Sequence, residues 1–220
     1  MRHSNLLGIM CTAAALTGLA GCAGKIRYPS HYTFNVPAPL PGSAEPKPVL
    51  GSVAVRQFRA PSFLRGGPIV YRRSPVQLDV YDYHRWAVDP RSAVTAAVVQ
   101  NIQKRGFFQS VQLFDGRGTS DYLVTGTLDH LEEVDKGRDV FIEVGLSAQL
   151  KNLKTGEVLW IDSSSETSKV GNRTVPSIVA EMSQAAENAV EHLVCSMQNR
   201  VASSSASIER RQPSSSETSD

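Results

Sequence analysis

The chain has 220 residues, a length that fits one domain with a single hydrophobic core and extra segments at its ends. Its 23 Lys and Arg residues nearly balance its 21 Asp and Glu residues, so the formal net charge is only +2. The basic residues are scattered among acidic ones, a pattern that does not favour a nucleic-acid-binding protein.

The first 21 residues have the features of a bacterial export signal. Arg2 and His3 give a positive start, and an uncharged apolar run follows from Leu6 to Leu19. A run of about 14 residues suits a signal peptide and is shorter than the roughly 20 residues that span a bilayer. We therefore predict that residues 1–21 are a signal peptide that is removed after export.

Four residues after this run resemble the lipobox of bacterial lipoproteins, in which small residues precede a cysteine whose sulfur receives diacylglycerol. They are Leu19, Ala20, Gly21 and Cys22. We predict that Cys22 is the lipidation site and that its acyl chains, such as palmitate, anchor the mature protein to a membrane. Ala23 stands where an aspartate would resemble an inner-membrane retention signal, so we expect the periplasmic face of the outer membrane. The alternative is a simple secretory signal in which the cysteines are incidental.

Two segments of the mature chain have compositions that favour limited order. Residues 22–49 contain five prolines between positions 37 and 48, so we predict a lipidated N-terminus followed by a Pro-rich tether. Residues 202–220 are rich in serine and charge and have no apolar period, which predicts a disordered tail. The folded domain is therefore expected over residues 50–201.

The first half of this domain is predicted to hold short strands. Val53, Val55 and Phe58 are spaced as in a first strand, and residues 69–72 and 76–81 suggest two more. These apolar positions should face a common core.

A helix is predicted between these strands and the second half of the domain. Asp89 suits the N-cap, Pro90 suits the first helical position, and Gly106 suits the end of the helix. Between them, Val94, Val98 and Ile102 recur at helical spacing. A short strand over residues 111–114 is expected to follow.

The second half of the domain should be an antiparallel meander closed by a long helix. The clearest strand covers residues 140–150, with residues 122–131 and 158–168 as its neighbours. The helix is expected over residues 175–200. Its apolar stripe consists of Ile178, Met182, Ala185, Ala186, Ala189, Leu193 and Met197.

The order of strands, helix, strands and helix predicts an α+β fold, a mainly antiparallel β-sheet with two helices packed on one face. The other face and the edges of the sheet would stay open, and an open edge can pair with a partner strand or with another copy of the chain. A homo-oligomer is therefore one expectation.

The usual sequence motifs of enzymes are absent from the chain, which has no Walker-type loop, H-E-x-x-H helix, paired-cysteine spacing or G-x-S-x-G turn. His130 and Glu132 could place two metal ligands on one strand face, but no second histidine is suitably spaced, so we interpret them as a solvated strand end. His192 is interpreted as a helix-surface residue, and Cys195, among apolar neighbours, as a small buried hydrophobe. We expect no catalytic residue, no metal site and no cofactor.

Two groups of residues resemble the ABC-type transport auxiliary lipoprotein family, the PqiC-like proteins. The first group is Ile69, Val70, Tyr71, Arg72, Arg73 and Ser74, with Leu78, Tyr81, Tyr83, His84, Arg85, Trp86, Ala87 and Pro90; the second runs from Arg27 to Phe34. The likeness extends from about Cys22 to Val201. It identifies residues 50–201 as the auxiliary lipoprotein domain and implies a structural or interface role for Tyr71, Tyr83, Arg85 and Trp86.

The resemblance implies a non-enzymatic accessory or docking component of an ABC/MCE-type system that moves lipid between the two membranes. Its partners would be a periplasmic MCE-domain protein and, through it, an inner-membrane ABC permease and ATPase. The alternative is an envelope-assembly or regulatory lipoprotein that binds a periplasmic enzyme or secretion machine. A hydrolase would need a polarised His84 or His130, and no motif supports it.

Overall fold

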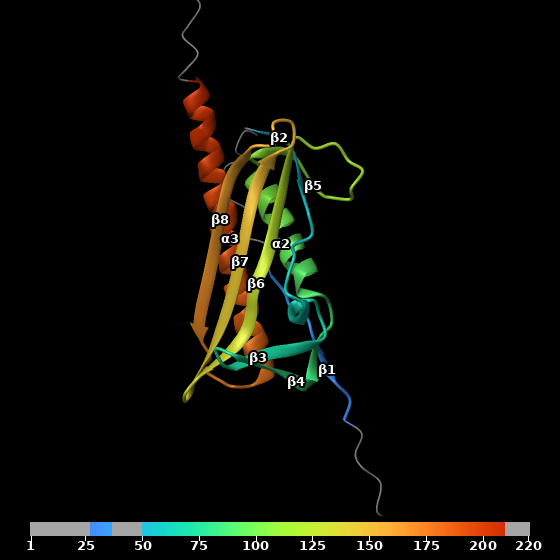
Figure 1. The fold of residues 1–220 in the computed structure, drawn as a ribbon, viewed down its shortest axis with the longest axis vertical. Helices are drawn as coiled ribbons and strands as arrows, with labels where there is room; N and C mark the ends of the chain where they lie inside the picture. The colour runs from blue at the N-terminus through green and yellow to red at the C-terminus, as the bar shows by residue number, and fades with distance from the viewer. Residues whose placement is uncertain (1–26, 37–49, 210–220) are drawn as a thin grey trace, which may run out of the picture.

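The computed structural model describes residues 27–36 and 50–209. The predicted signal peptide and the lipidation site at Cys22 lie outside these residues. The elements follow the predicted order of strands, helix, strands and helix, and they form one α+β domain (Figure 1).

Three long strands form the predicted antiparallel meander. β6 (Tyr122–Lys136) pairs with β7 (Asp139–Asn152), and β7 pairs with β8 (Val158–Lys169). A tight turn joins β6 to β7 through Gly137, whose φ of 70° lies in the region that glycine adopts without strain. The alternating apolar residues of β7 all face the core, as predicted. They are Val140, Ile142, Val144, Leu146, Ala148 and Leu150.

The other edge of β6 is shared by two separate strands. β2 (Leu50–Val55) pairs in parallel with the first residues of β6, and β3 (Pro68–Ser74) pairs in parallel near its end. The segment between them covers the middle of this edge, because Arg59 donates its N–H to the carbonyl of Gly126 (2.9 Å) and accepts from the N–H of Leu128 (2.8 Å). One strand therefore joins two halves of the sheet.

The remaining strands extend these two halves. β5 (Phe108–Leu113) pairs in parallel with β2, and β4 (Gln77–Trp86) pairs antiparallel with β3. A short 3-10 turn, η1 (Ser62–Leu64), precedes β3 and buries Leu64. The parallel pairings were not predicted, since they join segments far apart in the sequence.

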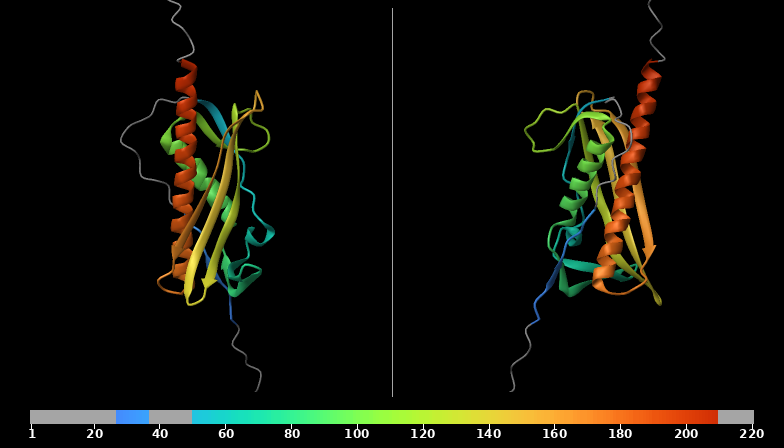
Figure 2. Two further views of the ribbon diagram at one scale, coloured as in Figure 1. Left: turned by 60° about the vertical axis from the view of Figure 1, so that its left-hand side comes forward. Right: turned by 180° about the vertical axis from the view of Figure 1, so that it is seen from behind.

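Two helices cover one face of the sheet, as predicted (Figure 2). α2 (Pro90–Arg105) begins where the Asp89 side chain accepts the N–H of Arg91 and ends at Gly106 in the left-handed conformation, with φ at 64°. α3 (Val175–Glu209) lies on the meander, and every residue of its predicted apolar stripe is buried. None of the helices within the described residues is long and apolar enough to cross a bilayer.

Two predicted boundaries are wrong. Part of the predicted tether, residues 22–49, belongs to the fold, because β1 (Ser30–Tyr32) pairs with β4 and the side chains of Phe34 and Val36 are buried. The predicted tail, residues 202–220, starts inside a helix, because α3 continues to Glu209. The burial of Phe34 and Val36 explains why the N-terminal segment joins the fold. The helix at the other end was missed because its last residues have no apolar period.

The close contact at Gly126 predicts a large effect of one added methyl group. A Cβ there would lie 2.4 Å from Phe58 Cε1 and 2.7 Å from the carbonyl oxygen of Ser147. We expect Gly126→Ala to lower the free energy of unfolding by about 1–3 kcal/mol, because the core has no room to give way. Urea denaturation measures this change. Gly171→Ala is the control, since a Cβ there meets no atom within 4 Å, and equal stability of the two variants would contradict the prediction.

Candidate functional site

The first described segment of the chain is fixed to the end of β4 by main-chain hydrogen bonds. β1 runs parallel to β4, with Ser30 opposite His84 and Tyr32 opposite Trp86. The N–H of Ala87 then donates to the carbonyl of Tyr32 over 2.8 Å. The stretch from Tyr83 to Ala87 therefore forms a cradle for the N-terminal strand.

Aromatic side chains reinforce this attachment. The rings of Phe34 and Trp86 meet edge to face with centroids 5.7 Å apart, and both residues are buried. The Tyr32 hydroxyl lies 2.9 Å from Nδ1 of His84. Burial of Phe34 gives the segment apolar contact area that three strand residues alone would lack.

A buried carboxylate lies under β4 beside this cradle. Glu133 of β6 is fully buried, and its Oε2 accepts a 2.5 Å hydrogen bond from the Tyr81 hydroxyl. The Arg173 guanidinium lies 3.2 Å from Oε1 and 2.6 Å from a carboxylate oxygen of Asp135. Burial, and then the Glu133 acceptor, raise the pKa of Tyr81 above its usual range. Together these groups join β4, β6 and the segment between β8 and α3.

The adjacent Glu132 is also buried, on the opposite face of β6. Arg72 of β3 binds its Oε2 through Nε at 3.0 Å and through a terminal nitrogen at 2.9 Å, and His130 lies 3.3 Å from Oε1. Glu132 thus neutralises Arg72 at the junction between β3 and β6. Among the described residues, no group of three or more His, Cys, Asp or Glu side chains is arranged to hold a metal ion.

The four residues assigned by resemblance lie on β3 and β4, in different environments. Trp86 is buried in the cradle, and Tyr71 packs on Tyr81 with ring centroids 4.9 Å apart. Tyr83 is 45% exposed, with the Arg27 guanidinium 5.9 Å from its ring centroid. Arg85 is half-buried in β4 opposite Pro68. Tyr83 is therefore the member of this group with the most surface available to a partner.

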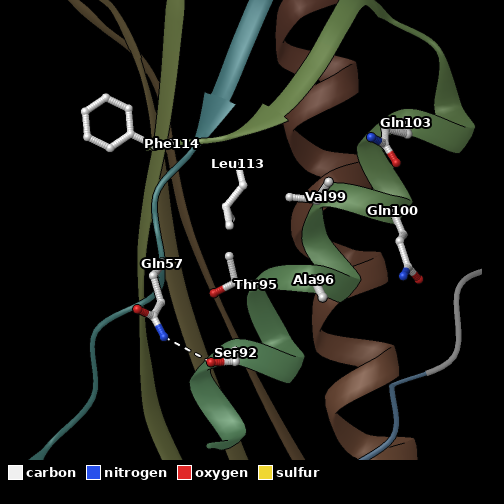
Figure 3. Close-up of a pocket in the computed structure, with 9 residues that line it drawn as sticks. All are labelled: Gln57, Ser92, Thr95, Ala96, Val99, Gln100, Gln103, Leu113 and Phe114. Carbon is white, nitrogen blue, oxygen red and sulfur yellow. Dashed lines mark hydrogen bonds between the residues drawn. The ribbon is translucent and has the colours of Figure 1, made fainter. Parts of the chain in front are cut away.

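A groove of about 540 Å³ lies between α2 and the end of β5 (Figure 3). None of the side chains that line it is an acid, a base or a cysteine. Thr95 is already engaged, since its Oγ1 accepts the N–H of Phe58 (3.0 Å) and donates to the carbonyl of Arg91 (2.6 Å). The lining consists of Gln57, Ser92, Thr95, Ala96, Val99, Gln100, Gln103, Leu113 and Phe114.

Ser196, Asp162 and His192 come together between β8 and α3 without forming a catalytic triad. The Ser196 hydroxyl donates to Asp162 Oδ2 over 2.5 Å and accepts the indole N–H of Trp160 over 3.1 Å. His192 approaches the same carboxylate oxygen at 3.7 Å. In a catalytic triad the serine hydroxyl donates its hydrogen bond to the histidine, whereas here the Ser196 hydroxyl donates to the Asp162 carboxylate. The hydrogen bond from Ser196 lowers the pKa of Asp162 and fixes α3 to β8.

Sequence reasoning missed the cradle and the buried glutamates. The cradle had a readable signal, because Tyr32, Phe34 and Val36 alternate as in a strand. Glu132 and Glu133 gave no such signal, since consecutive acids usually mark an exposed strand end. Their arginine partners, Arg72 and Arg173, are far away in the sequence.

The family assignment comes from a sequence match that covers most of the described elements. A family model described as the ABC-type transport auxiliary lipoprotein component matches residues 32–194. The chain belongs to this family. The match begins in β1 and ends within α3, so it includes the cradle and both buried glutamates of this auxiliary lipoprotein. The prediction made from the residues around β3 and β4 is confirmed.

Solved structures share the fold of this auxiliary lipoprotein. Protein XCC0632 from Xanthomonas campestris has a TM-score of 0.69 at 18% sequence identity, over 81% of this chain and 99% of that chain. An uncharacterized protein has a TM-score of 0.60 at 15% identity, over 78% of this chain and 99% of that chain. No curated protein matches the sequence. At these identities the similar structures establish the fold alone.

The packing of Phe34 on Trp86 predicts that one truncation will release the N-terminal strand. We expect Phe34→Ala to lower the free energy of unfolding by about 3 kcal/mol, because a buried ring is lost. Amide hydrogen exchange should accelerate at Ala87, whose N–H bonds to Tyr32. Tyr28→Ala is the control, since this ring is 80% exposed. Unchanged exchange at Ala87 in the Phe34 variant would show that the strand is held by other contacts.

The Tyr81 hydrogen bond predicts a dependence of stability on pH in the alkaline range. Because the pKa of Tyr81 is raised in the folded state, its contribution is complete below pH 10 and is lost as pH rises further, when only the unfolded chain releases the proton. Tyr81→Phe should lower the free energy of unfolding at pH 7 by about 1.5–3 kcal/mol and weaken its decline above pH 10.

Chemical denaturation at pH 7, 9, 10 and 11 measures both effects. Tyr83→Phe is the matched control on the same strand, because its ring is partly exposed. Parallel pH profiles for the parent and Tyr81→Phe would contradict the role given to this hydroxyl.

Proposed function

We propose that this auxiliary lipoprotein is held at the periplasmic face of the outer membrane by acyl chains on Cys22. There it would act as an accessory and docking component of an ABC/MCE-type system that moves lipid between the two membranes. The observation that carries this proposal is the match of residues 32–194 to the transport auxiliary lipoprotein family.

The N-terminal sequence supports the lipid anchor. Cys22 follows three residues typical of a lipobox and lies five positions before Arg27, the first described residue. Several acyl chains, at about 0.8 kcal/mol for each buried methylene group, give stable attachment. The domain would therefore act while held at a membrane surface.

The polar clusters of the domain favour a binding role over a catalytic one. The carboxylates of Glu132 and Glu133 are engaged with arginines, and the Ser196 hydroxyl is engaged with Asp162. Energy for transport would come from a partner ATPase. The protein would need no cofactor and no metal.

The partner we propose is a periplasmic MCE-domain protein, which would connect the lipoprotein to an inner-membrane permease and its ATPase. Two of the three edge strands of the sheet suit such contacts, because β5 pairs only with β2 and β8 only with β7 among the described residues. Their free sides can accept a strand from a partner or from a second copy. Tyr71, Tyr83, Arg85 and Trp86 lie on β3 and β4 instead, where they would support the fold or form a separate interface.

Replacing the lipidated cysteine tests the anchor and the function together. We expect Cys22→Ser to release the protein from membranes and to abolish complementation of an envelope lipid defect in a strain that lacks the parent gene. Cell fractionation and growth on detergent measure these results. Cys195→Ser is the matched control and should stay in the outer-membrane fraction, because its thiol is not part of the lipobox.

Co-purification tests the partner. The acylated parent, extracted in mild detergent, should recover an MCE-domain protein, and the complex should contain phospholipid. Recovery of a wall synthase or a secretion channel in its place would contradict the transport role while leaving the lipid anchor intact.

A further inference from the structure

The attachment of β1 to β4 limits how far the domain can move from its anchor. The Pro-rich residues 37–49 follow β1, so they lie between two fixed strands and add nothing to the length of the connection to Cys22. Only the residues between Cys22 and Ser30, where β1 begins, provide that length. Fully extended, these eight peptide steps span at most about 29 Å.

This connection starts at one end of an elongated molecule. β1 lies beside β3 and β4, at the end opposite the C-terminal end of α3 (Figures 1 and 2). The 35 residues of α3 correspond to about 52 Å. The fully extended connection is thus shorter than the domain.

The surface next to the chain exit has side chains suited to lipid headgroups. Tyr28 is 80% exposed and Tyr83 is 45% exposed, and the guanidinium of Arg27 lies 5.9 Å from the Tyr83 ring centroid. Tyrosine favours the boundary between water and hydrocarbon, and arginine extends its charge to phosphate groups. We call Arg27, Tyr28 and Tyr83 the basal surface. The turn between β6 and β7 lies at the same end and carries the exposed Arg138 beside Asp139.

We propose that the basal surface rests on the phospholipid headgroups of the bilayer that holds the acyl chains of Cys22. The domain then stands with β3 and β4 toward the membrane, and the turn between β7 and β8, with the C-terminal end of α3, faces the periplasm. This orientation rests on the lipidation of Cys22 in the proposed function. It leaves the far end of the domain accessible to a periplasmic partner.

Energy transfer to labelled lipids tests this orientation. Acylated protein with Cys195→Ser carries a donor dye at Val76→Cys, in the turn between β3 and β4, or at Leu153→Cys, in the turn between β7 and β8. Both positions are exposed, at 95% and 42%. On phosphatidylethanolamine–phosphatidylglycerol vesicles with acceptor-labelled headgroups, transfer should be several-fold higher from position 76. Equal transfer from the two positions would overturn the proposal.

Two insertions locate the connection that sets this orientation. Twenty Gly/Ser residues inserted after Gly24 form a flexible chain of about 25 Å and should reduce the difference between positions 76 and 153. The same insertion after Gly42 is the matched control and should leave the difference unchanged. A larger effect after Gly42 would show that the Pro-rich segment is the tether.

A further variant tests contact by the basal surface itself. Tyr28→Ser combined with Tyr83→Ser should narrow the difference in transfer, whereas Ile161→Ser, at a 73% exposed position on β8, should not. An unchanged difference in the double variant would overturn the contact. If Cys22 is not the anchor, the Cys22→Ser variant will remain on membranes, and this result is independent of the orientation. If the transport role is wrong, the vesicle measurements will be unchanged.

Discussion

Strand β6 has to satisfy hydrogen bonds along both edges over 15 residues, and the arrangement of the other strands follows from this requirement. β7 covers one edge in an antiparallel ladder whose register shifts once, between Leu128 and His130. The other edge is too long for β2, so β3 and the segment between β2 and β3 complete it. The β3–β4 hairpin is thereby placed at one end of the domain, and the cradle for the N-terminal strand is placed with it.

The elements that were predicted best from the sequence are those with one face exposed to solvent. The apolar alternation in β7 and the helical stripe of α3 are visible because polar residues separate their buried positions. β6 extends beyond its predicted end at Leu131 because Glu132 and Glu133 are buried against arginines. An alternation rule assigns such charges to solvent, so the sequence alone could not extend the strand.

The candidate site was predictable only in part. Residues of β3 and β4 predicted the family correctly. One of them, Trp86, is buried at the point where β4 pairs with β1. The role of residues 27–36 was missed because the prolines that follow suggested a continuous extended tether. Short parallel pairings such as β1 with β4 leave no local pattern, since each strand's partner is remote in the sequence. The contact between Phe34 and Trp86 could be found only with coordinates.

The direction of β1 decides how the domain bears mechanical force. A pull on the N-terminus first reaches β1, whose hydrogen bonds to β4 run across the strand axis. Such a pull strains these bonds side by side in shear, and the ring of Phe34 must separate from Trp86 in the core as β1 is released. Tension between a membrane and a bound partner would therefore detach β1 first and leave the meander and the helices folded.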